Sequence, residues 1–144
     1  MGKLGEAEPL LREALEGSRA VLGAQHPTTL KAVSGLAALL EAQGHLVDSE
    51  LLHREVLASQ RGTLGSQHPD AFSSMICQGN LLEKLGRLGE AEALFSEALT
   101  GRLRVLGREH EYTRVAYLKL VRVLEAQGKT REAWEVLAEY QSGR

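Results

Sequence analysis

Apolar residues recur three and four positions apart along most of this chain, which is the spacing of amphipathic α-helices. The segment from about Gly5 to Leu22 has one such inner face, made of Ala7, Leu10, Leu11, Ala14 and Leu15. The segment after His26, which runs to about Gln43, has another, made of Val33, Leu36, Ala37 and Leu40. No stretch alternates apolar and polar residues as a half-buried strand does. The pattern therefore predicts a chain built of helices alone.

A short sequence that returns along the chain separates the predicted helices. It reads LGAQHP at residues 22–27, LGSQHP at 64–69 and LGREHE at 106–111. Its glycine suits the left-handed residue just past a helix end, where a side chain would clash. Its proline suits the first helical turn, where the missing N–H has no acceptor to lose. A second glycine column lies at residues 2, 44, 86 and 128, and its members at 44, 86 and 128 end the other helices in the same way.

These columns define a repeat of 42 residues, because Leu22, Leu64 and Leu106 coincide at that shift. We name the helix after each repeated histidine the A helix. The helix after each glycine of the second column, at residues 2, 44, 86 and 128, is named the B helix. Each helix pair leaves an apolar stripe that it cannot cover alone, so neighbouring pairs must stack. The sequence therefore predicts an all-α fold, a right-handed α-solenoid of stacked antiparallel helix pairs, with about seven helices in the order B-A-B-A-B-A-B. We expect a single domain over residues 1–144, with a half repeat at 1–23 and repeats at about 24–65, 66–107 and 108–144.

Composition narrows the classes of function. The chain has 17 Lys and Arg against 19 Asp and Glu, a formal charge of -2, so no strong field attracts nucleic acid or an anionic membrane. Aromatic residues make up 4% of the chain and leave few platforms on which bases could stack. We expect neither a nucleic-acid nor a membrane partner. The single cysteine excludes an internal disulfide, and no secretion signal or membrane span is visible, so a cytoplasmic protein is expected.

The residues that could carry chemistry favour structural roles. His26, His68 and His110 recur with the repeat, but equivalent positions on stacked helices lie about 8–10 Å apart. One zinc ion holds its ligands at roughly 2 Å, so successive copies cannot share it. We interpret these imidazoles as capping or packing at the helix starts. Cys77 has no histidine near it in the sequence, and no phosphate-binding glycine loop is present. We therefore expect no enzyme activity, catalytic residue, metal ligand or cofactor.

Two of the B helices begin with similar sequences, GKLGEAEPLLREAL at residues 2–15 and GRLGEAEALFSEAL at 86–99. The sequence LGAQHP at 22–27 leads into an A helix. These sequence motifs resemble those of the tetratricopeptide repeat, in the 42-residue form found in kinesin light chains, and the resemblance covers essentially the whole chain. The resemblance implies a protein–protein interaction scaffold whose A helices line a concave groove. Kinesin light chains carry two asparagines in the middle of each A helix. This sequence has Ser34 with Gly35, Ile76 with Cys77 and Leu118 with Lys119 at those positions.

The resemblance also implies which A-helix positions would face a partner in the groove. Aligned on the glycine that ends each A helix, they are Lys31, Ser34, Gly35, Ala38, Glu41 and Ala42 in the first repeat, Ser73, Ile76, Cys77, Asn80, Glu83 and Lys84 in the second, and Val115, Leu118, Lys119, Arg122, Glu125 and Ala126 in the third. A groove that binds an extended peptide needs polar groups to fix the backbone and apolar surface for affinity.

The later repeats supply both kinds of group, with polar Asn80, Lys84, Lys119 and Arg122 beside apolar Ile76, Val115 and Leu118. This mixture predicts an acidic peptide, or one with a C-terminal carboxylate, that carries an apolar anchor. Alternatively, the cations pair with Glu83 and Glu125 on the same helix faces, as exposed charges on helices often do.

The two ends of the chain raise further alternatives. No A helix precedes the first B helix, so the apolar face that it would share lies uncovered, and such surface usually marks an interface. The rival hypothesis is a structural or self-associating segment of a larger repeat array, with no peptide ligand. In the last helix, Trp134 and Tyr140 are expected to cap the core, or alternatively to anchor a partner.

Overall fold

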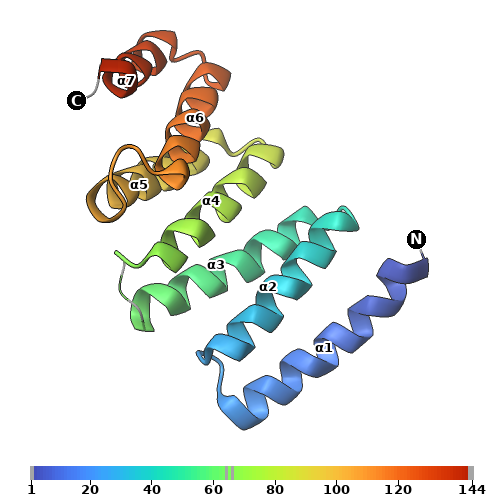
Figure 1. Cartoon of the computed structure of the whole chain (residues 1–144). Helices are drawn as coiled ribbons and strands as arrows, with labels where there is room; N and C mark the ends of the chain where they lie inside the picture. The colour runs from blue at the N-terminus through green and yellow to red at the C-terminus, as the bar shows by residue number, and fades with distance from the viewer. Residues whose placement is uncertain (1, 64, 66, 143–144) are drawn as a thin grey trace. The chain divides into compact units, whose positions relative to one another are not determined.

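The structure, a computed structural model, describes residues 2–63, 65 and 67–142, with side chains from residue 5 onward. Within these residues it contains seven helices and no strand (Figure 1). They are α1 (Gly2–Leu22), α2 (Pro27–Ala42), α3 (Leu46–Thr63), α4 (Pro69–Lys84), α5 (Leu88–Val105), α6 (Glu111–Ala126) and α7 (Thr130–Ser142). The A helices are α2, α4 and α6, and the B helices are α1, α3, α5 and α7. The prediction of an all-α fold of alternating A and B helices is confirmed.

The chain divides into two compact units, an N-terminal unit (Met1–Gly65) and a C-terminal unit (Ser66–Arg144). In the N-terminal unit α2 packs on both α1 and α3. In the C-terminal unit α5 packs on α4 and α6, and α6 also packs on α7 (Figure 1). Within each unit every helix therefore packs on the helix next to it in the chain, as stacked helix pairs require. A single domain over residues 1–144 stays a prediction.

The repeated glycine and proline residues lie at the helix ends, as predicted. Gly44, after α2, has a φ of 85°, and Gly23, after α1, has a φ of 93°. A Cβ is strained in this left-handed region, which is why glycine recurs there. Pro27 and Pro69 are the first residues of α2 and α4.

The repeated histidines cap the A helices. The Nδ1 atom of His26 accepts a hydrogen bond of 3.1 Å from the backbone N–H of Thr28. His68 and His110 make the same 3.1 Å contact with the second residue that follows each of them. Each imidazole thereby satisfies one N–H group that the helix itself leaves without an acceptor. The interpretation of these residues as caps is confirmed.

The core of the N-terminal unit lies between α1, α2 and α3. Its buried cluster comprises Leu15, Leu30, Val33, Leu36, Leu40 and Val56, with Leu11, Ala32 and Leu52 packed against it. The predicted inner face of α2 is buried throughout. On α1 the prediction was partly wrong, because Leu10 and Ala14 are exposed. They point away from α2, on a side of α1 that no described helix covers.

Two aromatic rings and two glycines join α4 to α5 in the C-terminal unit. The ring of Phe72 in α4 lies on Gly101 in α5, where a Cβ would stand 2.1 Å from the phenyl Cε1 atom. The ring of Phe95 in α5 lies on Gly79 in α4, where a Cβ would stand 2.4 Å from the phenyl Cε1 atom. Each glycine thus leaves the space that a ring on the neighbouring helix fills.

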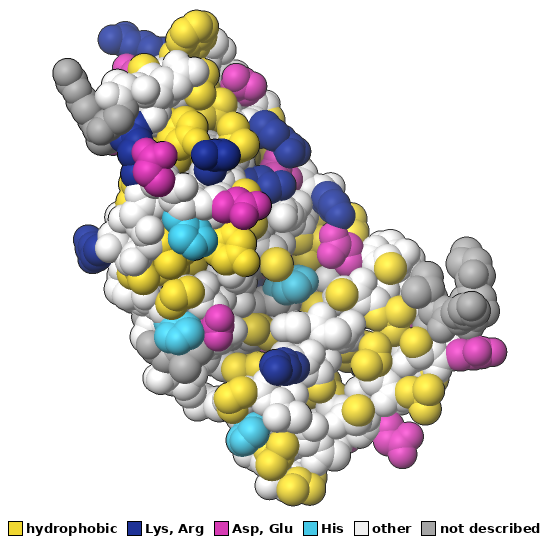
Figure 2. Space-filling view, in the orientation of Figure 1, with side chains coloured by type: hydrophobic (Ala, Val, Ile, Leu, Met, Phe, Trp, Pro, Cys, Tyr) yellow, Lys and Arg dark blue, Asp and Glu magenta, His cyan; other side chains and the backbone are white. Residues whose placement is uncertain are grey.

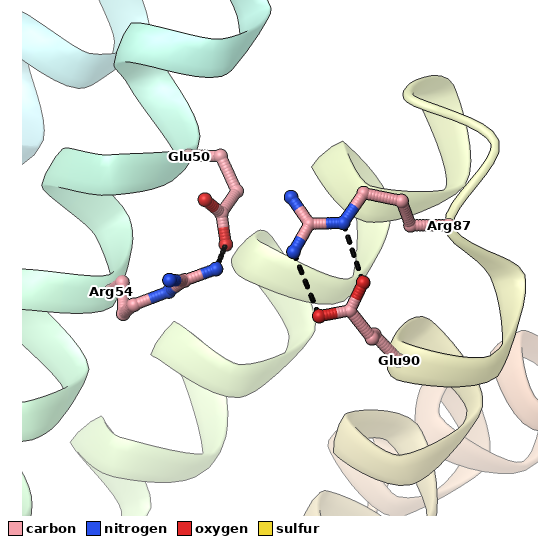
Figure 3. Close-up of polar contacts among 4 residues, drawn as sticks. All are labelled: Glu50, Arg54, Arg87 and Glu90. Atoms are coloured by element: carbon pink, nitrogen blue, oxygen red, sulfur yellow. Dashed lines mark hydrogen bonds and ion pairs between the residues drawn. The ribbon is translucent and has the colours of Figure 1, made fainter.

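Two arginine–glutamate pairs, one in each unit, accompany these apolar contacts (Figure 3). In α3 of the N-terminal unit Arg54 donates a 2.7 Å hydrogen bond to Glu50, whose side chain is buried. In the C-terminal unit Arg87, just before α5, donates to both carboxylate oxygens of Glu90, with 2.7 Å between Nη2 and Oε1. Glu90 lies in the first turn of α5, where a negative charge favours the helix.

Candidate functional site

The sequence-predicted partner-binding residues all lie on the A helices, and the structure presents most of them to solvent. Exposed side chains are Lys31, Ala38, Ala42, Ser73, Cys77, Lys84, Leu118, Arg122, Glu125 and Ala126. Partly buried residues are Ser34, Gly35, Glu41, Asn80, Glu83, Val115 and Lys119. Ile76 differs, because its side chain is 8% exposed and offers little apolar surface to a partner. Because α2 belongs to the N-terminal unit, the candidate site consists of the residues on α4 and α6, which belong to the C-terminal unit.

An ion pair connects α4 to α6 across this surface. The Nη2 atom of Arg122 lies 3.7 Å from Oε2 of Glu83, whose side chain is mostly buried. The sequence left open that the cations predicted to bind a peptide pair with glutamates instead. For Arg122 this alternative is correct, because it pairs with Glu83. Because the Arg122 side chain is 65% exposed and the two atoms are 3.7 Å apart, the pair is worth at most about 1 kcal/mol. It still leaves the guanidinium accessible and fixes its position beside α4.

Lys119, Asn80 and Leu118 offer three different kinds of contact on the same two helices. Among the described residues, the Lys119 ammonium has no ion-pair partner. The Oδ1 atom of Asn80 is buried and has no hydrogen-bond partner within the described part of the chain. Leu118 is 51% exposed. A cation, an unused amide oxygen and an apolar side chain are what an extended peptide with an acidic residue can bind.

Arg102 is a buried residue that links α5 to α6, and the sequence did not predict it. Its side chain is buried in α5, and its Nη1 atom donates a 2.7 Å hydrogen bond to the carbonyl oxygen of Tyr112 in α6. Its guanidinium also lies 5.4 Å from the centre of the Tyr112 ring. Burial lowers the pKa of Arg102, and the neighbouring Tyr112 and Cys77 partly oppose that shift. No sequence signal marked this residue, because arginine in a helix is usually exposed.

The two aromatic residues of α7 have different environments. The ring centres of Tyr140 and Tyr117 lie 4.5 Å apart, and Arg114 Nε donates a 2.8 Å hydrogen bond to the Tyr140 hydroxyl. Burial raises the pKa of Tyr117. Tyr140 therefore covers the end of the core, as expected. Trp134 does not, since it is 68% exposed.

The described residues form neither a metal site nor a membrane-spanning helix. No group of three or more histidine, cysteine, aspartate or glutamate side chains in them is arranged to hold a metal ion. No helix formed by the described residues is both long enough and apolar enough to cross a membrane.

The comparisons with known proteins agree with this architecture. The model of the tetratricopeptide repeat family matches residues 1–62 and 70–141. A Podosopora anserina protein assigned as a kinesin light chain, with nearly identical TPR-like repeats, is 27% identical with a TM-score of 0.87. A single-substitution variant of that protein matches equally well, and in both cases the alignment covers 96% of this chain and 66% of the other.

A second solved structure, BtubC (BKLC) from P. vanneervenii, shares the fold at 18% identity, with a TM-score of 0.85. The alignment covers 98% of this chain and 56% of BtubC. The chain therefore spans less than two thirds of the length of these relatives. No curated protein matches its sequence significantly.

Proposed function

Because this chain belongs to the tetratricopeptide repeat family, with repeats similar to those of a kinesin light chain, we propose that it is a protein–protein interaction scaffold rather than an enzyme. Its partner is an acidic peptide or helix of another protein, and the A-helix surface of α4 and α6 is where that segment binds. Repeats of this family generally serve as interaction scaffolds, and the fold alone does not select the partner.

The observation that carries the proposal is the buried Oδ1 atom of Asn80, which has no hydrogen-bond partner among the described residues. A buried acceptor without a partner costs about 1–3 kcal/mol. Asn80 as a residue is only partly buried, so rotation of its side chain would bring Oδ1 to the surface. A peptide N–H that donates to it there would remove that cost and would fix the peptide backbone beside α4. Lys119 would then pair with an acidic side chain and Leu118 would contact an apolar one.

Selection from a random peptide library, followed by fluorescence anisotropy on the selected peptides, tests this function. We expect peptides with a net negative charge and one apolar anchor. Lys119→Glu reverses a charge that contacts the peptide, so it should weaken binding about tenfold or more. Asn80→Ala should weaken it as well, because the backbone loses its acceptor.

Arg131→Glu is the matched control, since it makes the same charge change on α7, where Arg131 is exposed and, among the residues that the structure describes, pairs only with the exposed Glu135. It should leave peptide affinity unchanged. Equal losses for Lys119→Glu and Arg131→Glu would show a general charge effect and contradict a site on α4 and α6. Selected peptides without acidic bias would contradict it too.

The rival function, a self-associating or structural segment of a larger array, is favoured by a separate observation. Leu10 and Val21 on α1 are 67% and 81% exposed. Under this function the sedimentation coefficient rises with concentration, and Lys119→Glu leaves that rise unchanged. A concentration-independent coefficient combined with selective peptide binding would decide against it.

A further inference from the structure

The side of α1 that faces away from α2 carries a continuous small and apolar stripe, Leu10, Ala14, Gly17 and Val21, which we name the α1 outer face. These residues are spaced four, three and four positions apart and therefore lie along one side of the helix. All four are exposed. Figure 2 shows hydrophobic side chains at the surface along the part of the N-terminal unit that α1 forms.

The equivalent positions on α3 show what such a face binds. Leu52 and Val56 lie 42 residues after Leu10 and Ala14, and both pack in the cluster that α2 shares with α3. On the same side of α3, Ser49 Oγ donates a 2.7 Å hydrogen bond to the carbonyl oxygen of Ala37 in α2. On a B helix, these positions are therefore where the preceding A helix packs.

The equivalent positions on α5 make the comparison sharper, because α1 and α5 are nearly the same helix. Residues 2–23 read GKLGEAEPLLREALEGSRAVLG, and residues 86–107 read GRLGEAEALFSEALTGRLRVLG. In α5 the preceding A helix, α4, places the ring of Phe72 on Gly101. The matching residue in α1 is Gly17, where a Cβ would meet nothing within 4 Å. Thus α1 has the glycine that receives an aromatic ring, without a ring on it.

Glu13, which lies beside the α1 outer face in the sequence, has an equivalent on α3 that forms an ion pair. Glu55 in α3 accepts a 2.7 Å hydrogen bond from Arg19 Nη2, which comes from α1, the preceding B helix. Glu13 in α1 occupies the position of Glu55 one repeat earlier, and it is exposed. Glu13 therefore corresponds to the carboxylate of the Arg19–Glu55 pair, and the described residues contain no preceding B helix that could supply the arginine.

We propose that the α1 outer face is a docking site for an A-type helix of a further repeat of the same class, with an aromatic residue at the position of Phe72 that lies on Gly17. The B helix paired with it brings an arginine to Glu13. A second copy of this chain does not supply that helix, because Phe72 already lies on Gly101, and α2 and α6 each pack between two B helices. The proposal is independent of peptide binding on α4 and α6, and its test reads out α1 alone.

The test places a known A helix in the register that α4 has with α5. A copy of residues 66–85 replaces Met1, so that its last leucine runs into Gly2 as Leu85 runs into Gly86. Hydrogen exchange of the α1 amides and the Tm of the full chain are then measured with and without this added helix. We expect at least about tenfold slower exchange along α1, and a Tm higher by about 4 °C or more.

Two alanine substitutions give a matched pair on α1. Gly5 corresponds to Gly89, which has nothing within 4 Å of a Cβ even beside α4, whereas Gly17 corresponds to Gly101, which Phe72 covers. Without the added helix, both Gly5→Ala and Gly17→Ala should leave the chain folded, because neither Cβ meets a neighbour. With the added helix, Gly17→Ala should abolish the slower exchange, and Gly5→Ala should keep it. Changing the added copy of Phe72 to alanine should narrow the difference between the two variants.

Three results would overturn the proposal. No slowing of α1 exchange by the added helix would show that the face does not bind an A helix. Equal slowing in Gly5→Ala and Gly17→Ala would show that no ring lies on Gly17. A chain without the added helix that dimerises, and that Leu10→Lys makes monomeric, would identify a second copy as the occupant.

Discussion

His68 illustrates how one side chain can set the start of a helix in each repeat. Its Nδ1 atom accepts from the backbone N–H of Asp70 at 3.1 Å, which requires the ring proton to be on Nε2. Because Pro69 removes one N–H from the first turn and His68 satisfies another, the start of α4 exposes fewer unpaired donors to water. The histidine and the proline thus act together as a start signal.

Replacing this cap should destabilise the chain by a predictable amount. We expect His68→Ala to lower the free energy of unfolding in urea by about 1 kcal/mol, the usual cost of losing a side-chain cap. His68→Asn should recover most of the loss, because its amide oxygen can accept the same bond. Amide exchange at Asp70 should quicken in the alanine variant only. The exposed neighbour Gln67 provides the control, and a loss in Gln67→Ala as large as in His68→Ala would contradict the capping role.

The sequence identified the repeated residues well and the solitary ones poorly. The histidines, prolines and glycines were predictable because each recurs at one spacing and each has a backbone reason to do so. Arg102 was not, because the same column holds Ser18 and Gln60 in the earlier repeats, which carry no charge. Its hydrogen bond to Tyr112 depends on where α6 begins relative to α5, which periodicity does not specify.

Between elements, Glu92 connects α5 to the turn that precedes α7. Its Oε1 atom accepts from Lys129 Nζ at 2.9 Å and from Gln127 Nε2 at 2.7 Å. These hydrogen bonds, first that of Lys129 and then that of Gln127, lower the pKa of Glu92 from its ordinary value of 4.5. The contact therefore needs an ionised carboxylate, and it ties together elements that are adjacent in space but distant in sequence.

The sign of its pH dependence follows from that shift. Since the folded chain holds Glu92 ionised more readily than the unfolded chain does, the stabilisation is fully present above about pH 4.5 and is lost as the pH falls through the folded pKa. We expect Glu92→Gln to lower the Tm by about 2 °C at pH 7. The difference from the unmodified chain should shrink as the pH falls below 4, as followed by circular dichroism. Glu109→Gln, an exposed control, should not show this trend, and a Glu92→Gln difference that persists in acid would contradict the assignment.

At this scale the sequence predicted the helices and their order closely, but not every face. The segment expected to run from about Gly5 to Leu22 forms α1 from Gly2 to Leu22, and the turn glycines fall where they were placed. Leu10 was assigned to an inner face and is exposed, because the spacing of apolar residues shows that a face exists and not which helix covers it. The A-helix positions were likewise predictable by alignment, while the pairing of Arg122 with Glu83 required coordinates.

For the whole molecule, the main consequence of the repeat is that stabilising contacts join neighbouring helices. Within the C-terminal unit, α4 packs on α5, α5 on α6 and α6 on α7. Because helix packing is mainly between helices that follow one another in the sequence, the contact order is low and parts of the chain can fold as nearest-neighbour modules. The fully buried rings of Phe72 and Phe95 and the covering of Tyr117 by Tyr140 give this unit a core within residues that it contains itself.

The C-terminal unit should accordingly fold when it is produced without the rest of the chain. We expect a fragment of residues 66–144 to have a helical circular dichroism spectrum and one cooperative thermal transition, because the packing of α4 on α5, of α5 on α6 and of α6 on α7 lies entirely inside it. Phe72→Ala is the internal check, since removing a fully buried ring from the surface of Gly101 should cost about 3–5 kcal/mol and abolish or greatly weaken the transition. A fragment that is helical but melts without cooperativity, and that Phe72→Ala does not change, would show that the interdigitated rings and glycines of α4 and α5 do not suffice to specify a core.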